Sequence, residues 1–222
     1  WNFPMAIPTW KIFPALLCGN TVVFKPASDT PATATLLVEI LMEAGVPPGV
    51  VNIVHGGGGE VGNAIVDHDE VDLVSFTGST AVGKKISEMA SRTLKRVSLE
   101  LGGKNAQIVM DDADINLAID GVLWGAFGTT GQRCTATSRL LLHEWIFDKF
   151  MSGLVERVKD LRLGDGLDPE TQVGPCVNEA QRNVVQEYVE IGNREGAKPV
   201  CGGKVAIGGA LSKGWFYEPT IF

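Results

Sequence analysis

The stretch TVVFKPASDTPATATLLVEILMEAGVPPGVVNIV, residues 21–54, decides the fold class of this chain. It begins with a β-branched and aromatic run at 21–24, which is typical of a short buried strand. Thr30 and Pro31 then predict the N-cap and the first position of a helix. Another apolar run at 50–54 predicts a second strand. A strand, a helix and a strand in this order indicate parallel strands joined by a right-handed crossover.

The same alternation continues along the chain. We expect further strands at 71–76, 106–110 and 138–143, and further helices at 64–66, 80–90, 114–127, 145–161 and 178–195. This alternation predicts an α/β protein with a doubly wound parallel sheet. We place a domain boundary near Gly102 and Gly103, because two adjacent glycines allow a hinge there.

The composition excludes several classes of function. The net charge is −7 and no Lys/Arg stripe offsets it, which argues against a nucleic-acid partner. Gly, Pro or polar residues interrupt the apolar stretches well short of a membrane span, so no membrane partner is expected. The histidines have no metal-site spacing and the four cysteines no paired spacing, so no metal is expected. Unpaired cysteines favour a reducing compartment, and we expect the cytoplasm.

Two glycine-flanked segments carry side chains suited to covalent catalysis. Cys134 ends the segment GQRC, and Glu100 lies in the segment LELGGK. A thiol must become a thiolate to attack, and a nearby carboxylate can act as the base for a proton or a water. From the residues alone, the commoner explanations are a small buried apolar residue at Cys134 and a strand end at Glu100.

Five segments, in order, resemble the aldehyde dehydrogenase superfamily. They are WNFP at 1–4, PALLCGNTVVFKP at 14–26, FTGST at 76–80, and the segments around Glu100 and Cys134. The resemblance covers the whole chain, as far as GWFYEPTIF at 214–222. It implies the aldehyde dehydrogenase fold, with the C-terminal part of a Rossmann-like coenzyme domain at 1–102. The N-terminal part of an α/β catalytic domain would follow at 103–222. Family members are much longer, so we expect an internal fragment that is inactive by itself.

The resemblance implies a role for three residues in oxidising an aldehyde to a carboxylic acid with NAD or NADP. Cys134 would attack the carbonyl carbon, and the Asn2 amide would hold the oxyanion together with the Cys134 backbone N–H. Glu100 would then activate the water that hydrolyses the thioester. From the residues alone, Asn2 before Phe-Pro fits a turn.

The cofactor's pyrophosphate has two candidate positions. The segment GGGEVG at 57–62 fits G-x-G-x-x-G between a strand and a helix, but the next strand lacks an acidic residue at its end. The resemblance places the pyrophosphate at 78–83 instead, where a strand leads into a helix N-terminus that attracts anions. A plain N-cap is the alternative there. The cofactor-binding residues that the resemblance implies are Trp1, Lys25, Ala27, Ser28, Gly62, Phe76, Thr77, Gly78, Ser79, Val82, Gly83 and Leu101.

Ser28 bears on the choice between the two cofactors. Family members that prefer NAD often carry a Glu at this position, where it binds the adenosine ribose and repels a 2′-phosphate. A serine hydroxyl near the Lys25 ammonium is compatible with that phosphate, so we expect NADP to be used at least as well as NAD. Asp29 is the opposing influence, since a carboxylate turned inward would restore the repulsion.

Several alternatives remain open. The segments at 25–28 and 131–139 are similar to semialdehyde dehydrogenases of sugar-acid breakdown, such as 2-oxoglutarate semialdehyde dehydrogenase. A CoA-acylating enzyme of the same fold is a rival, but that branch lacks the carboxylate at the position of Glu100. A non-catalytic scaffold is another, and it predicts loss of Cys134 or Glu100. The expected partners are a small aldehyde and further copies of the protein, in a homodimer or homotetramer. Trp124 and Phe127 either line the aldehyde tunnel or pack in the core.

Overall fold

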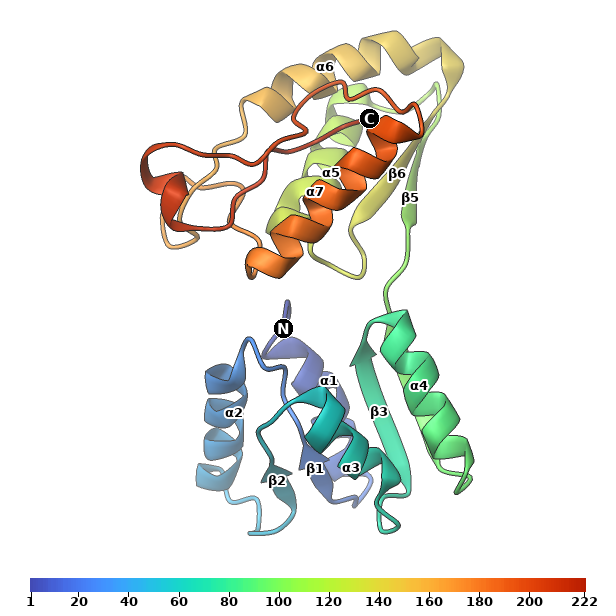
Figure 1. The fold of residues 1–222 in the computed structure, drawn as a ribbon, viewed down its shortest axis with the longest axis vertical. Coiled ribbons are helices and arrows are strands. Elements are labelled where there is room, and N and C mark those ends of the chain that lie inside the picture. The colour runs from blue at the N-terminus through green and yellow to red at the C-terminus, as the bar shows by residue number, and fades with distance from the viewer. The chain divides into compact units, whose positions relative to one another are not determined.

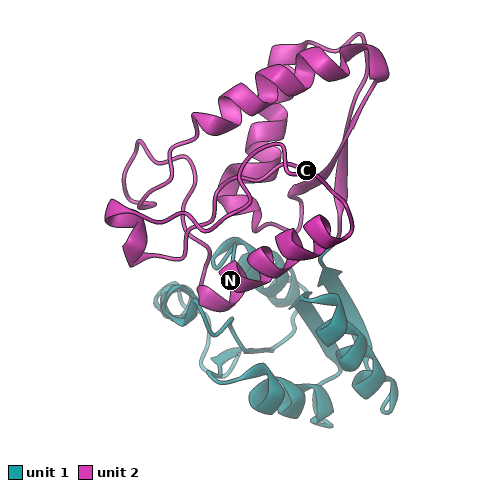
Figure 2. Cartoon of the chain, turned by 45° about the horizontal axis from the view of Figure 1, so that its top comes forward, with its two compact units in different colours: residues 1–102 teal, residues 103–222 magenta.

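A computed structural model describes residues 1–222 as two compact units. Unit 1 is Trp1–Gly102 and unit 2 is Gly103–Phe222, coloured separately in Figure 2. The division falls between the two adjacent glycines. No helix in either unit has the length and the apolar character needed to cross a membrane.

Unit 1 alternates helices and strands, and its strands are parallel. Its elements are α1 (Ala6–Leu17), β1 (Val22–Phe24), α2 (Pro31–Glu43), β2 (Val51–Ile53), a helical turn (Gly58–Gly62), α3 (Asn63–Asp67), β3 (Leu73–Gly78), α4 (Thr80–Ser91) and β4 (Arg96–Leu101) (Figure 1). β1 pairs with β2, and β3 pairs with β4. The α/β class and the three expected strands of this unit are therefore confirmed.

The hydrogen bonding of the strands differs from the single sheet that was predicted. Strands are joined only in pairs, β1 with β2, β3 with β4 and β5 with β6. In unit 1 each pair packs its own apolar cluster. The first contains Ile12, Leu37, Val38 and Val51, and the second contains Val66, Val74, Ile86 and Ala90. Each of these two pairs therefore packs against its own set of apolar side chains.

Unit 2 is built around one parallel pair covered by helices. Its elements are β5 (Asn105–Val109), α5 (Ile115–Phe127), a 3₁₀ turn (Gly128–Gly131), β6 (Thr137–Leu142), a second 3₁₀ turn (Glu144–Ile146), α6 (Phe147–Lys159), α7 (Glu179–Arg194) and a third 3₁₀ turn (Gly209–Lys213) (Figure 1). Phe150 and Leu154 of α6 are 0% and 1% exposed in a cluster that also holds residues of β5 and α5. Burial of each side chain contributes about 1.5–3 kcal/mol.

Side chains cap three helix starts in the structure, and the cap expected at Thr30 is absent. Ser79, Asp114 and Asn178 each accept a hydrogen bond from a backbone N–H in the first turn of α4, α5 and α7. Each side chain thus satisfies one of the N–H groups that a helix start leaves open. The prediction of a capping side chain at Thr30 was wrong, since it makes no such bond, although Pro31 does begin α2.

Candidate active site

Cys134 lies in a tight turn between α5 and β6. The backbone N–H of Ala136 donates to the carbonyl oxygen of Arg133 at 3.1 Å, and this bond closes the turn. Cys134 therefore occupies the second of four turn positions, and the turn's closing hydrogen bond does not use its own N–H. The Cys134 side chain is exposed. An exposed thiol next to an available backbone N–H can attack a carbonyl and stabilise the resulting oxyanion.

The residues before this turn adopt an uncommon backbone conformation. Thr129, Thr130 and Gly131 have φ values of 56°, 58° and 66°, in the left-handed region that β-branched residues avoid. A side chain at Gly131 would bring its Cβ to 2.8 Å from the carbonyl oxygen of Ala126, so only glycine fits there. The hydroxyl of Thr130 donates to the carbonyl of Gly174 at 2.9 Å and fixes this strained segment. Such strain persists only where surrounding contacts enforce it, and it is common at functional sites.

Arg133 ties the turn to the end of α5. Its guanidinium stacks on the ring of Trp124 at 3.8 Å, and Nη2 donates to the carbonyl oxygens of Trp124 (2.6 Å) and Gly125 (3.3 Å). These carbonyls belong to the C-terminal end of α5, where the helix dipole favours a cation. Arg133 thus anchors the residue directly before Cys134. Phe127 packs against the core of unit 2, whereas the Trp124 side chain is 69% exposed.

Gln132 makes a further link to the segment before α7. Its Oε1 accepts a hydrogen bond from the N–H of Val177 at 3.0 Å, and its Nε2 donates to the carbonyl of Pro175 at 3.4 Å. Pro175 and Val177 flank Cys176. The Gln132 side chain therefore connects the Cys134 turn to the backbone on both sides of Cys176. Contacts from Thr130, Gln132 and Arg133 therefore restrict the loop on two sides.

The four cysteines differ in their surroundings. Cys134 and Cys18 are exposed, Cys176 is buried and Cys201 is partly buried. Burial raises the pKa of both Cys176 and Cys201, which keeps these thiols protonated and unreactive. Cys18 lies at the C-cap of α1, where its side chain is exposed. The chain thus exposes two thiols, and only Cys134 lies in a constrained turn.

Glu100 lies at the carboxyl end of β4, in unit 1. The β3–β4 register pairs Thr77 with Glu100 and Gly78 with Leu101. Four of the predicted site residues therefore meet at the same ends of two neighbouring strands, where open α/β folds bind ligands. The Glu100 side chain is exposed and so remains accessible to water.

Lys11, in α1, is a charged neighbour of Glu100 that sequence reasoning missed. Its Nζ donates to the hydroxyl of Ser75 in β3 at 2.7 Å. Partial burial lowers the pKa of Lys11, and the negative charge of Glu100 opposes that shift. Lys11 is the only charged residue of α1, within the sequence AIPTWKIFPALL. A single lysine in an apolar helix was the available signal, because a half-buried ammonium requires a partner.

The end of the β1–β2 pair holds a surface groove. It has a volume of about 630 Å³ and is lined by Pro26, Ala27, Ser28, Pro31, Ala32, Thr35, His55, Gly56 and Gly57. Lys25 Nζ donates to the carbonyl oxygens of Pro26 at 2.6 Å and Gly56 at 3.4 Å, and so connects the two strand ends. A side chain at Gly62 would come within 3.9 Å of the Lys25 stem. The groove thus brings together Ala27 and Ser28, with Lys25 and Gly62 close by.

The N-terminal end of α4 gathers the remaining cofactor candidates. Ser79 Oγ accepts a hydrogen bond from the N–H of Val82 at 3.3 Å, which caps the helix. Gly83 is needed for packing, because a Cβ there would lie 2.7 Å from the Leu101 side chain. A Cβ at Gly78 would likewise lie 2.5 Å from the Phe76 ring. Contacts within the unit therefore explain the glycines at 78 and 83 by themselves.

A dinucleotide fits the residues present in unit 1. The hydroxyl of Thr77 is buried and has no hydrogen-bond partner within the chain, which leaves a donor and an acceptor for a bound group. Lys25 supplies a positive charge at the edge of the groove. A nucleotide carries hydroxyls and phosphates that match these groups.

Asn2 and Trp1 precede α1 in unit 1. The Asn2 side chain is half-buried and Trp1 is 37% exposed. Asn2, Glu100 and all the cofactor candidates thus belong to unit 1, whereas Cys134 belongs to unit 2.

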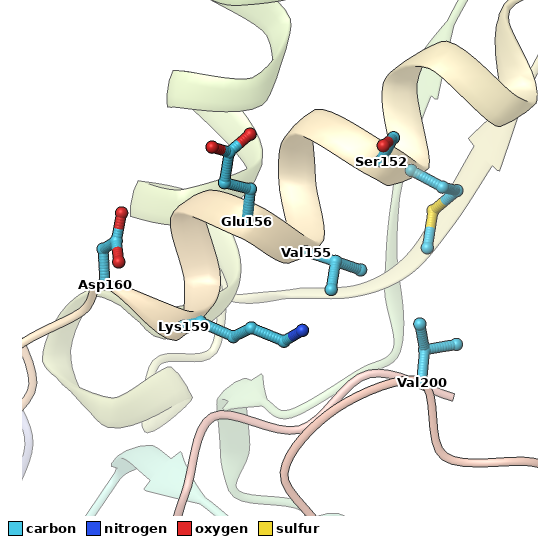
Figure 3. A pocket seen from close by; sticks show the side chains of 7 residues that line it. Ser152, Val155, Glu156, Lys159, Asp160 and Val200 are labelled. Carbon is cyan, nitrogen blue, oxygen red and sulfur yellow. The ribbon is translucent and has the colours of Figure 1, made fainter.

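A second hollow lies in unit 2 and holds none of the predicted site residues. It has a volume of about 510 Å³ and lies on α6, lined by Met151, Ser152, Val155, Glu156, Lys159, Asp160 and Val200. Figure 3 shows Val155 and Lys159 extending from α6 toward the segment that carries Val200. Its lining combines the negative charges of Glu156 and Asp160 with the positive charge of Lys159.

The sequence profile of the aldehyde dehydrogenase family matches residues 1–222. The chain belongs to the aldehyde dehydrogenase family. Among curated relatives, the betaine aldehyde dehydrogenase of Bacillus subtilis (strain 168) is 48% identical over 222 residues, all of this chain and 45% of that protein. The 2,5-dioxopentanoate dehydrogenase of Saccharolobus solfataricus is 49% identical over 224 residues, all of this chain and 46% of that protein.

Solved aldehyde dehydrogenases share the fold. The betaine aldehyde dehydrogenase of Staphylococcus aureus in complex with NAD⁺ matches with a TM-score of 0.97 and 43% sequence identity. The match covers 99% of this chain and 44% of that chain. This aldehyde dehydrogenase chain spans less than half the length of the curated relatives it matches. The expected family resemblance and fold are thereby confirmed.

Proposed function

We propose that this chain carries the nucleophile, the base and the coenzyme site of an NAD(P)-dependent aldehyde dehydrogenase. Residues 1–102 would form part of the coenzyme domain, and residues 103–222 part of the catalytic domain. The observation that carries the proposal is the Cys134 turn. The thiol is exposed, the preceding residues 129–131 have strained positive φ values, and the backbone N–H of Cys134 is available to an oxyanion. Family membership over the whole chain supports it.

The chain's own residues would carry out the chemistry around the bound aldehyde. The Cys134 thiolate forms a bond to the carbonyl carbon, and the electron pair of the carbonyl moves to oxygen. The Cys134 N–H and the Asn2 amide donate to that oxygen, where two donors lower the barrier by several kcal/mol. When bound, the nicotinamide ring supplies the acceptor for the hydride that leaves this carbon.

Glu100 would act in the second half of the reaction. Its carboxylate takes a proton from water, the hydroxide adds to the thioester carbon, and the carbon–sulfur bond breaks to release the acid and the thiol. Glu100 is exposed at its strand end, so water can reach its carboxylate. This accessibility supports hydrolysis rather than transfer of the acyl group to another thiol.

The coenzyme would lie along the carboxyl ends of the strands in unit 1. Ala27 and Ser28 line the groove that fits the adenosine half, with Lys25 and Gly62 at its edge. The remaining candidates would hold the pyrophosphate and the nicotinamide half; they are Trp1, Phe76, Thr77, Gly78, Ser79, Val82, Gly83 and Leu101. The unpartnered hydroxyl of Thr77 supports this arrangement.

A semialdehyde is the proposed substrate class. Relatives at 48% and 49% identity are named for betaine aldehyde and for 2,5-dioxopentanoate, so overall identity does not separate these aldehydes. The segments GQRCTATSR and KPAS favour the semialdehyde branch, and further relatives are named alpha-ketoglutarate semialdehyde dehydrogenases.

Single-cysteine substitutions test the proposal in the protein expressed from its complete gene. Cys134→Ala should abolish NAD(P)-dependent oxidation of a 2-oxo semialdehyde, a loss of at least about 10⁴-fold in kcat. Cys18→Ala is the matched control, because Cys18 is the other exposed thiol, and it should retain most of the activity. Substantial turnover in Cys134→Ala, measured as reduced cofactor at 340 nm, would contradict the proposal.

A further inference from the structure

The side-chain amide of Asn105 holds the turn that carries Cys134. Its Nδ2 donates to the carbonyl oxygen of Cys134 at 2.7 Å and to that of Ala136 at 3.0 Å. An amide NH₂ group has two hydrogens, and both are used here. Asn105 lies 29 residues before Cys134 along the chain, so this is a tertiary contact between β5 and the turn.

The strand pairing is irregular at this residue. Asn105 pairs with Thr137, but Ala106 pairs with Arg139, so Ser138 has no partner and forms a bulge. Bulges redirect a strand and its side chains, and they are frequent next to active sites. The guanidinium of Arg139 donates twice to the carbonyl of Lys104, at 3.1 and 2.6 Å, and fixes the start of β5. The backbone that presents Asn105 is therefore itself held from β6.

These hydrogen bonds fix both peptide groups that flank Cys134. The peptide before Cys134 is held through the carbonyl of Arg133, which accepts from the N–H of Ala136. The peptide after Cys134 is held through its own carbonyl, which accepts from Asn105. With both peptide planes fixed, φ and ψ of Cys134 are fixed, and so is the direction of its Cα–Cβ bond.

The second of these peptides is the one that tight turns can flip. Type I and type II turns differ mainly by a rotation of the central peptide, here the peptide between Cys134 and Thr135. The flipped form requires positive φ at Thr135, a conformation that Thr129 and Thr130 already adopt nearby. β-branching therefore does not by itself exclude the flip, and the Asn105 amide supplies the contact that opposes it.

We infer that Asn105 is a positioning residue for the nucleophile, which it orients through the Cys134 carbonyl without contacting the substrate. The inference rests on the proposed role of Cys134. This inference gives the first residue of β5 a role in catalysis in addition to its pairing with β6. Loss of the amide should leave the fold and the coenzyme site intact. It should allow the peptide after Cys134 to rotate, so that the thiol is no longer held in one direction.

The test uses Asn105→Ala in the protein expressed from its complete gene. We expect kcat for the aldehyde to fall about 10- to 100-fold, since small misplacements of a reacting group have effects of this size. The dissociation constant of the coenzyme, measured by fluorescence, should change less than about twofold. Asn20→Asp is the control, because Asn20 also donates its amide to a backbone carbonyl, that of Ala15, and it should leave kcat unchanged.

A second measurement keeps the inference independent of dehydrogenase activity. Iodoacetamide alkylates exposed thiolates, and mass spectrometry assigns the modification to Cys134. The rate constant at high pH, where the thiol is fully ionised, depends on how the sulfur is oriented and exposed and not on its pKa. In Asn105→Ala, the ratio of the Cys134 rate constant to the Cys18 rate constant should change by at least about threefold. Loss of a hydrogen bond typically has an effect of this size. If the parent oxidises no aldehyde, the proposed function fails, and this measurement still tests Asn105.

Two results would overturn the inference. One is an unchanged kcat together with an unchanged alkylation rate in folded Asn105→Ala. The other is a loss of activity matched by an equal loss of coenzyme affinity, which indicates general disruption rather than positioning. If Asn105→Ala does not fold, Asn105→Asp takes its place. It keeps the side-chain shape and replaces the donor by an acceptor facing two carbonyls, and the same outcomes apply.

Discussion

Ser28 lines the groove at the end of the β1–β2 pair, and its size and neutrality bear on the choice of coenzyme. We expect the parent protein to use NADP at least as well as NAD. Ser28→Glu should lower the ratio of kcat/KM for NADP to that for NAD by at least about tenfold, because a carboxylate repels a 2′-phosphate. The measurement is steady-state kinetics with both coenzymes.

Ser28→Ala controls for loss of the hydroxyl alone, and it should shift the ratio much less than Ser28→Glu does. A strong NAD preference in the parent that Ser28→Glu leaves unchanged would show that another group, with Asp29 the nearest acidic candidate, sets the choice.

Cys176 gives a prediction about stability and pH. Burial raises the pKa of its thiol above the ordinary value, and the nearby positive charge of Arg182 opposes the shift. The folded protein therefore releases this proton at higher pH than the unfolded chain does. The resulting stabilisation is fully present below the unfolded pKa and is lost as the pH rises through the folded pKa.

Urea unfolding of the parent and of Cys176→Ala at pH 7 and pH 10 measures this effect. The stability advantage of the parent over Cys176→Ala should be smaller at pH 10 than at pH 7. An advantage that stays constant or grows over this range would contradict the burial argument.

Residues of the candidate site differed in how far the sequence could predict them. Cys134, Glu100 and Asn2 were found from short motifs, and their roles remain predictions. Lys11, Asn105 and Arg133 were missed because their significance depends on partners in other elements, and no local spacing encodes such contacts. The one local signal was the charge of Lys11 in an otherwise uncharged helix.

At the scale of elements, the loop between α5 and β6 depends on Gly131. Its φ is +66°, and a Cβ at this position would lie 2.8 Å from the carbonyl oxygen of Ala126, so there is no space for a side chain. Gly131→Ala should destabilise the protein by about 1–3 kcal/mol and lower kcat by displacing Cys134. Urea unfolding and steady-state kinetics measure the two effects.

Gly166→Ala is the matched control for this element. Gly166 lies in a loop of the same unit, and a Cβ there meets nothing within 4 Å. It should leave both stability and kcat close to those of the parent. Equal effects of the two substitutions would show that the left-handed turn has no special role.

Most elements followed from hydrophobic periodicity, but α1 and β4 were not among the expected elements. α1 contains Pro8 and Pro14, and Pro8 lies in the first turn, where a missing N–H costs little. For β4 only a strand end at Glu100 was considered, and the structure places Glu100 near the end of that strand. The alternation of Val97, Leu99 and Leu101 as partly buried positions could have identified the whole strand. The pairing of strands into separate two-stranded ladders had no local signal.

At the scale of the whole molecule, the chain divides into two units, each with its own core. The proposed chemistry draws on both, with Cys134 in one unit and Glu100 and the coenzyme groove in the other. The sequence motifs already followed this division, since the glycine pair at 102–103 separates the Glu100 segment from the Cys134 segment. The central claim is therefore that Cys134 is the residue that becomes acylated and that Glu100 is the base that hydrolyses the acyl group.

Trapping the acyl-enzyme tests this claim most directly. Glu100→Gln, expressed from the complete gene and mixed with NAD(P) and a semialdehyde, should release close to one reduced cofactor per active site and then turn over slowly. Mass spectrometry of the quenched protein should find one acyl group, attached as a thioester to Cys134. Rapid multiple turnovers without a burst, or an acyl group on any residue other than Cys134, would contradict the account.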